Sequence, residues 1–217
     1  MKNLQDIWDD VPPDYYQKSV SENPMQKIWH KNRIRAVRNI LTKHIGSKKH
    51  KKLLDVGCAS GWFLSQLLAS HPQLTYSGID VYKDGIRYAK KNYPDIRFGI
   101  ADAHKLPYKN ASFDVVICMN VLEHAVDPKT IVKEIKRVAK KDAIVIIGMD
   151  SENTLFKLTW TAWKLLKGRV WKHAHLHAFS IKNLEKLFKE CGFAIEEKAV
   201  FNYTMSLVHT LRKKGED

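Results

Sequence analysis

The chain has 217 residues, a formal net charge of +14 and 44% hydrophobic residues, a size and composition that suit one folded domain and exclude two large ones. It contains no uncharged apolar run of about 18 to 20 residues, and its acidic start lacks the basic and apolar regions of a signal peptide, so we expect a cytoplasmic protein, or one bound peripherally to a membrane surface. Three widely spaced cysteines without a Cys-x-x-Cys pair argue against a disulfide framework or a zinc site.

The first segment of the chain predicts a basic helix. A helical pattern begins after Asn23-Pro24, with apolar residues on one face, Trp29, Val37, Ile40 and Leu41, and basic residues on the other, Lys27, Lys31, Arg35 and Arg38. Residues 27–52 hold ten Lys or Arg and no acid, and such a surface attracts lipid headgroups, nucleic acid or acidic metabolites alike. An ordinary solvated helix face is the alternative interpretation.

From residue 53 onward, short apolar runs alternate with amphipathic stretches, which is the pattern of β-α-β units in a mostly parallel sheet. Strands are predicted near 53–57, 74–80, 96–100, 114–119 and 143–148, with helices near 61–70, 84–93, 129–140 and 180–191. The last runs, 193–200 and 203–211, leave no room for a helix between them and predict an antiparallel hairpin at the sheet's edge. We therefore expect an α/β fold with a doubly wound, mostly parallel, seven-stranded Rossmann-like sheet.

Residues 155–171, between the fifth strand and the last helix, break this rhythm. Plotted as a helix, their apolar side chains cover more than half of the circumference, so another surface must cover them. The segment is either a lid packed on the sheet or an insertion that lies in a membrane interface or lines a lipophilic substrate pocket. In the second case its tryptophans would lie at the boundary with water: Trp160, Trp163 and Trp171.

A glycine-rich turn follows the first predicted strand in the run Leu53-Leu54-Asp55-Val56-Gly57-Cys58-Ala59-Ser60-Gly61. Such a turn directs backbone N–H groups and the positive end of a helix at a ligand, and its small residues let the ligand approach closely. Asp80 ends the next strand, 23 residues after Gly57, where a nucleoside-binding doubly wound fold places a carboxylate for ribose hydroxyls. These features leave a dehydrogenase and a methyltransferase as alternatives.

Further motifs follow in order along residues 53–192. They are Gly78-Ile79-Asp80; Ala101-Asp102-Ala103 with Leu106-Pro107-Tyr108; Ser112-Phe113-Asp114-Val115-Val116; Val121-Leu122-Glu123-His124; and Phe179-Ser180 leading to Gly192-Phe193. With the glycine-rich turn, they resemble the class I S-adenosylmethionine-dependent methyltransferase family, in particular its ubiquinone-biosynthesis-like, type 11 branch that acts on small molecules or lipids. The resemblance implies methyl transfer with S-adenosyl-L-methionine as cofactor, and a dehydrogenase is not expected to show the last four motifs.

The resemblance also implies a division of the chain. Residues 1–217 would form a single methyltransferase domain, in which 1–50 is an N-terminal basic helical lid and 51–150 is the cofactor-binding core. Residues 151–178 would be the apolar Trp-rich insertion, and 179–217 the last helix and edge hairpin.

Cofactor roles follow for the matching residues. Gly57, Cys58, Ala59 and Gly61 would wrap the methionine half, with Asp55 anchoring the turn and orienting the ammonium group. Asp80 would accept from the ribose hydroxyls, Val81 or Tyr82 would pack on the adenine, and Met119 and Asn120 would face the sulfonium. Asp102 would accept from the adenine amino group and Ala103 would donate its backbone N–H to the ring, unless Asp102 merely caps a loop.

Ala59 stands where the family more often has a second glycine. If its φ stays negative, we expect cofactor binding to survive, whereas a requirement for positive φ would lower the affinity.

Methyl transfer is an in-line displacement at an activated carbon, so the protein mainly has to align the reactants and exclude water. His124 is the candidate general base or substrate-positioning residue, with a structural hydrogen bond as the alternative. Some quinone O-methyltransferases of the family hold a divalent metal with two acids and a histidine near this position. Asn120, Glu123 and His124 leave one acid missing, so no metal is expected.

Two further groups are candidates for the substrate side. His173, His175 and His177 alternate, but no nearby acid completes a metal site, so we expect His175 or His177 to border the acceptor pocket. In the N-terminal segment, five residues resemble the lid that closes over the methionine carboxylate in related enzymes: Tyr15, Tyr16, Trp29, His30 and Arg33.

The stretch after the fourth strand, Met119-Asn120-Val121-Leu122, lacks the prolines and aromatic residue typical of amino-nucleobase methyltransferases, which disfavours a nucleic-acid substrate without excluding it. The basic helix and the Trp-rich segment together favour a lipophilic acceptor, such as a quinone precursor or lipid headgroup, at an anionic membrane surface. The methylated atom would be O, N or C. The alternatives are a soluble metabolite, protein or RNA acceptor, and a catalytically silent partner subunit that only binds the cofactor.

Overall fold

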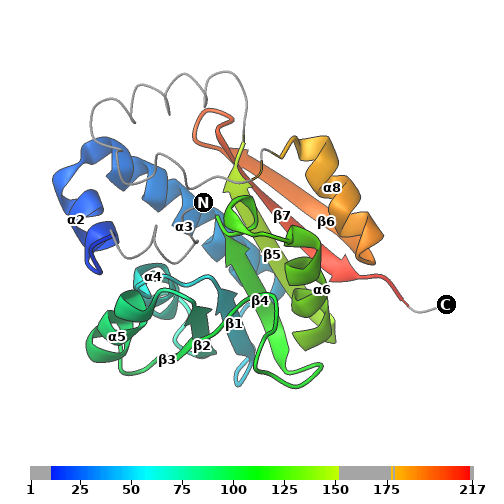
Figure 1. Cartoon of the computed structure of the whole chain (residues 1–217), viewed down its shortest axis with the longest axis horizontal. Helices are drawn as coiled ribbons and strands as arrows, with labels where there is room; N and C mark the ends of the chain where they lie inside the picture. The colour runs from blue at the N-terminus through cyan, green and yellow to red at the C-terminus, as the bar shows by residue number, and fades with distance from the viewer. Residues whose placement is uncertain (1–10, 152–176, 178, 216–217) are drawn as a thin grey trace.

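A computed structural model describes residues 11–151, 177 and 179–215, which form a seven-stranded sheet with strand order β3-β2-β1-β4-β5-β7-β6 (Figure 1). The strands are β1 (Lys52–Val56), β2 (Thr75–Asp80), β3 (Arg97–Ile100), β4 (Phe113–Met119), β5 (Ala139–Asp150), β6 (Phe193–Phe201) and β7 (Ser206–Lys213). The helices are α2 (Tyr15–Glu22), α3 (Pro24–His44), α4 (Trp62–Leu68), α5 (Lys83–Asn92), α6 (Pro128–Val138) and α8 (Ile181–Glu190), with a short 3-10 turn, η1 (Leu122–His124).

The first five strands pair in parallel, whereas β7 runs antiparallel to both β5 and β6. The predicted doubly wound sheet with an antiparallel C-terminal hairpin is therefore confirmed. The hairpin does not simply extend the edge, because its second strand, β7, lies inside the first and pairs with β5.

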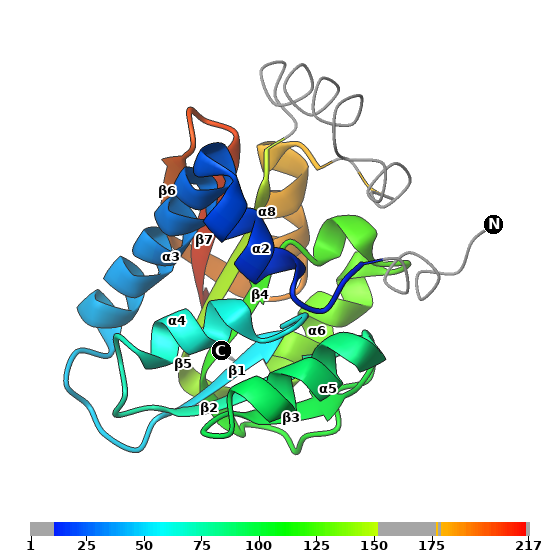
Figure 2. The same ribbon diagram turned by 90° about the vertical axis from the view of Figure 1, so that its left-hand side faces the viewer.

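Helices cover both faces of the sheet (Figure 2). Neighbouring strand residues point to opposite faces, so Leu54 and Val116 pack with α6 and α8, while Leu53 and Val115 pack with α3, α4 and α5. Because the central strands are buried on both sides, they are continuously apolar in sequence, and this is why their positions could be predicted.

The N-terminal helices differ from the prediction in two respects. Helix α2 was not predicted because it buries no residue and so carries no apolar periodicity. Helix α3 begins where expected, with the Asn23 side chain accepting hydrogen bonds from the backbone N–H groups of Met25 and Gln26. Its buried face holds His30, Ile34, Val37, Ile40 and Leu41, whereas Trp29, predicted on that face, is only half-buried.

The Trp-rich segment 155–171, with Trp160, Trp163 and Trp171, and the histidines His173 and His175 lie outside the described residues. Among the residues that are described, no helix is both long and apolar enough to span a bilayer.

Asp114 links three strands at the end of the sheet that lies opposite the glycine-rich turn. Its buried carboxylate accepts hydrogen bonds from Lys51 Nζ at 3.0 Å, Lys52 N at 3.0 Å and Lys140 Nζ at 2.8 Å, which join β4 to the starts of β1 and β5. Burial acts to raise the pKa of Asp114, but the hydrogen bonds from Lys140, Lys52 and Lys51 outweigh it and hold the pKa below its usual value.

We expect Asp114→Asn to lower the free energy of unfolding at pH 7 by about 1 to 3 kcal/mol, because two lysines lose their carboxylate partner. A depressed carboxyl pKa stabilises the fold above the unfolded pKa of about 4 and ceases to do so as the pH falls through the folded-state value. The difference between wild type and variant in urea unfolding should therefore be widest near neutral pH and narrow below about pH 4. A gap that stays constant across this range would contradict this account of Asp114.

Candidate functional site

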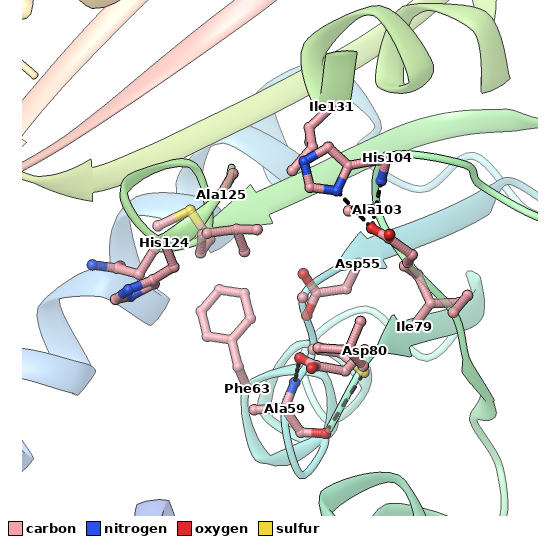
Figure 3. A pocket seen from close by; sticks show the side chains of 18 of the residues that line it. Asp55, Ala59, Phe63, Ile79, Asp80, Ala103, His104, His124, Ala125 and Ile131 are labelled. Atoms are coloured by element: carbon pink, nitrogen blue, oxygen red, sulfur yellow. Dashed lines mark hydrogen bonds and ion pairs between the residues drawn. The ribbon is translucent and has the colours of Figure 1, made fainter. Parts of the chain in front are cut away.

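A cavity of about 530 Å³ lies at the C-terminal ends of β1, β2 and β4, where ligands bind in doubly wound sheets (Figure 3). Its walls come from the loops that follow the first four strands, and α2, α3, α4 and α6 complete them. Residues far apart in sequence therefore meet around one space at the edge where the parallel strands end.

Most of the predicted site residues line this cavity. Those from the cofactor set are Asp55, Gly57, Cys58, Ala59, Asp80, Val81, Asp102, Ala103, Met119 and Asn120, and those from the substrate and lid set are Tyr16, His30, Arg33 and His124. Sequence reasoning missed several wall residues, among them Trp62, Phe63, His104, Val126 and Asp127. These belong to loops and helix starts, where no periodic pattern shows which way a side chain points.

Five predicted residues of the described chain do not line the cavity, and one of them, His177, is described with η1 below. Gly61 caps α4 with φ of +77°, and a Cβ there would come within 2.6 Å of the Phe98 ring, so the glycine serves the turn itself. Tyr82 is buried elsewhere, with its hydroxyl donating to the Val11 carbonyl, which leaves the wall to Val81. Tyr15 and Trp29 also lie outside the lining.

Asp80 holds the glycine-rich turn in shape. Its Oδ2 accepts the Ala59 N–H at 2.7 Å and its Oδ1 accepts the Tyr82 N–H at 2.9 Å. The Ile79 carbonyl accepts from the N–H groups of Gly57 and Cys58 at 2.8 and 3.0 Å. The end of β2 thus supports the turn that follows β1 through three hydrogen bonds, and the fourth, from Tyr82, orients the Asp80 carboxylate.

Ala59 adopts φ of +48°, so the favourable expectation that its φ stays negative is wrong. The reason is geometric, because the N–H of residue 59 has to point at Asp80 while the chain reverses between Gly57 and Gly61, both of which also have positive φ. Residue 59 therefore has a backbone conformation in the left-handed region, which favours glycine, although it carries a Cβ.

Two acids lie together below the turn. Asp55 and Asp80 are both buried, and burial followed by the charge of Asp80 raises the pKa of Asp55 to about 8. Burial also raises the pKa of Asp80, although hydrogen bonds from the backbone of Tyr82 and Ala59 oppose the effect. Such a pair favours a ligand that brings positive charge to this part of the cavity.

At the opposite side, α2 and α3 close the cavity with aromatic and basic groups. The His30 ring packs edge-on between Tyr16 and Trp62, each with its centroid 5.6 Å away, and burial together with Arg33 lowers the pKa of His30 to about 3. His30 is therefore a neutral wall residue at physiological pH, and Arg33 supplies positive charge beside it.

Asp150, at the end of β5, connects this wall to the sheet. Its Oδ1 accepts from Arg33 Nη2 at 3.3 Å and from Ser206 Oγ at 2.8 Å, and its Oδ2 accepts from Asn120 Nδ2 at 3.0 Å. Asn120 is held in this position with φ of +54°. Asp150 had no motif to reveal it, because its role arises from contacts with residues distant in sequence.

His124 (Figure 3) ends η1 and, like Asn120, lines the cavity after the fourth strand. The neighbouring Glu123 is buried, and its backbone carbonyl accepts the N–H of His177 at 3.0 Å. His177 therefore lies against η1 without lining the cavity, while His175 falls outside the described residues. No group of three metal-ligating side chains occurs within the part of the chain that the structure describes.

Comparisons with known proteins agree with this geometry. Residues 47–192 match the family described as the methyltransferase domain. An uncharacterised protein of Methanocaldococcus jannaschii is 31% identical over 179 residues, covering 82% of this chain and 77% of that protein. The ubiquinone biosynthesis O-methyltransferase of Idiomarina loihiensis is 28% identical over 162 residues, covering 69% of this chain and 63% of the relative. A solved S-adenosylmethionine-dependent methyltransferase of Methanosarcina mazei superposes with a TM-score of 0.66 at 22% identity, covering 82% and 98% of the two chains.

We expect Ala59→Gly to raise the free energy of unfolding by about 0.5 to 1 kcal/mol, because the relief of positive-φ strain exceeds the added entropy of a glycine in the unfolded chain. Thermal or urea unfolding would measure it. Ala69→Gly offers a control, since Ala69 is exposed with φ of −59° and gains no relief. An Ala59→Gly protein no more stable than wild type would show that the turn is not strained.

Proposed function

The chain belongs to the S-adenosylmethionine-dependent methyltransferases, and from that premise we propose that it transfers the methyl group to a small lipophilic acceptor, a quinone precursor or a lipid headgroup, reached at an anionic membrane surface. The observation that carries the methyl transfer is the convergence of three carboxylates on one cavity, Asp55, Asp80 and Asp102, from the ends of three neighbouring strands.

The cavity suits the cofactor at several points. A Cβ on Gly57 would lie 2.2 Å from Val121 Cγ2, so only glycine leaves the turn this close to the wall. Asn120 lines the cavity, and its Oδ1 is buried without a hydrogen-bond partner among the described residues, which suggests that a ligand supplies one. Asp55 and Asp80 would face the charged methionine half and the ribose, and Asp102 with Ala103 the adenine.

S-adenosylmethionine, when bound, supplies a methyl group already activated by its sulfonium. The protein then has to align the acceptor and keep out water, and the aromatic wall of Tyr16, Trp62 and Phe63 serves the second purpose. His124 would orient the acceptor, and would take its proton where the acceptor is a phenol or an ammonium.

The lipophilic acceptor is supported by the two faces of α3. Its inner face brings His30 and Arg33 to the cavity, and its outer face is basic and partly apolar. Lys27, Lys31 and Arg35 are exposed there, and Met25 and Ile28 are 70% and 58% exposed. A helix of this kind that settles on anionic lipid would place the cavity wall next to the bilayer surface.

The activity is tested with S-adenosylmethionine labelled in its methyl group, incubated with separate lipid and aqueous extracts. We expect labelled product in the lipid fraction. Label confined to the aqueous fraction would replace the lipophilic acceptor by a soluble metabolite, and label on protein or RNA would point to a macromolecular one. Cofactor binding without labelled product in any fraction would favour the silent partner subunit.

The membrane surface is tested by sedimentation with vesicles of mixed neutral and anionic phospholipid. The wild type should sediment with anionic vesicles at low salt and be released as the salt rises, because screening weakens the attraction. The double variant Lys27→Glu with Lys31→Glu should bind several-fold more weakly. The control variant Lys90→Glu with Lys91→Glu makes the same charge change on α5, away from α3. If both variants lose vesicle binding equally, net charge alone explains the binding and α3 has no specific part in it.

Asp55 predicts a pH dependence of cofactor binding. Its pKa of about 8 leaves it mostly protonated at pH 7 in the free protein, and a cationic ligand beside it favours the ionised form. Binding of S-adenosylmethionine should therefore release close to one proton at pH 7 and none above about pH 9, so the affinity should rise with pH up to about 8. Calorimetry in buffers of different ionisation enthalpy counts this proton. Asp55→Asn should abolish the release, and an unchanged proton count in that variant would assign it to another group.

A further inference from the structure

We propose that His104 is a positioning residue that fixes the Asp102 carboxylate and thereby gives the cavity its preference for a 6-amino purine over a 6-oxo purine. The inference rests on the proposed function, since it takes the nucleoside of the cofactor to lie against Asp102. It concerns a residue that no sequence motif singled out and that lines the cavity between two loops (Figure 3).

Asp102 lies in the loop after β3, and its side chain is 63% exposed. An exposed carboxylate ordinarily samples several rotamers and recognises nothing with precision. Here His104 holds it twice, because Oδ1 accepts the His104 backbone N–H at 2.9 Å and contacts His104 Nδ1 at 2.7 Å. Both contacts use Oδ1, so Oδ2 is left for a ligand.

The other ring nitrogen decides the protonation of His104. The backbone N–H of Asp127 lies 3.2 Å from His104 Nε2, and since a backbone N–H only donates, Nε2 accepts. The ring is then neutral, with its proton on Nδ1, and that proton is donated to Asp102. The two contacts together select one tautomer and one ring orientation.

The position of Asp127 is fixed by the helix that it caps. It caps α6, where its Oδ1 accepts from the N–H groups of Lys129 at 3.0 Å and Thr130 at 3.2 Å. The buried face of α6 anchors the helix in the core through Ile131, Val132, Ile135 and Val138. His104 therefore ties an exposed recognition loop to a helix start that the core holds still.

The charge of Asp102 determines which purine substituent the carboxylate accepts. Burial acts to raise the pKa of Asp102, but its hydrogen bonds with His104 outweigh it and keep the pKa below the usual value, so the carboxylate is ionised near neutral pH. An ionised carboxylate accepts from an exocyclic amino group and repels a carbonyl oxygen in the same place. A carboxylate held in one position increases the difference in affinity between the two purines, because a mobile carboxylate would turn away from the carbonyl oxygen and avoid the repulsion.

The test compares the binding of S-adenosylhomocysteine and S-inosylhomocysteine by calorimetry. We expect His104→Ala to lower the preference for the adenosyl ligand by about tenfold, mostly through loss of adenosyl affinity. His104→Asn should recover most of the preference, because its amide nitrogen stands near the Nδ1 position and still donates to Asp102. His104→Gln, which reaches toward Asp127 instead, should resemble His104→Ala.

A control variant is available in His44→Ala. His44 Nε2 also contacts a carboxylate, Glu197 Oε1 at 3.0 Å, but on α3 and β6, away from the cavity. It should leave the preference unchanged. Thermal unfolding of each variant would separate a loss of fold from a loss of selectivity.

Equal weakening of both ligands in His104→Ala, or no recovery in His104→Asn, would overturn the inference and leave the proposed function standing. A wild-type protein that binds neither ligand would overturn both. A wild type that binds the two ligands equally would remove the preference assigned to Asp102, and the role of His104 with it.

Discussion

The structure around the cavity depends on one buried carboxylate, that of Asp80. It accepts the N–H of Ala59 from the turn after β1 and the N–H of Tyr82 from the start of α5, so a single side chain sets the relative position of two loops. A charge buried this deeply is tolerated because it is hydrogen-bonded on both oxygens. The positive φ of Ala59 is a consequence of that demand, and the pKa of Asp55 is raised first by its own burial and then by the negative charge of Asp80 beside it. Asp80 therefore contributes both to the geometry of the turn and to the raised pKa of Asp55.

Much of this could be predicted from the sequence, and the exceptions have a common reason. The central strands and the helices beside them were predicted because burial on both sheet faces makes strands apolar and leaves helices amphipathic. Motif spacing also placed Asp55, Asp80 and Asp102 at the ends of neighbouring strands. Spacing does not give side-chain direction, and so Gly61 and Tyr82 were assigned to a cavity that they do not line. Asp150 and His104 acquire their roles from partners distant in sequence, and α2 buries nothing that would mark it.

Helix α3 illustrates how one element serves several purposes. The repeat of its buried residues fastens it to the sheet, His30 and Arg33 close the cavity, and the remaining face carries exposed cations. The three sets occupy different sides of a 21-residue helix, so changes on the exposed side leave packing intact. Substitutions on the exposed side can thus change the surface charge of the helix while the cavity wall stays the same.

The position of β7 has a consequence for how the site is assembled. Strand β7 comes last in the described chain, yet it lies between β5 and β6, and its first residue, Ser206, shares Asp150 with Arg33. Asn202, in the turn before β7, also bonds Asn32 and the Trp29 carbonyl on α3. The N-terminal half of α3 is therefore held to the sheet partly by residues at the other end of the described chain. These contacts have a high sequence separation, about 170 residues between Asn32 and Asn202, and contacts of this kind are closed at a high entropic cost.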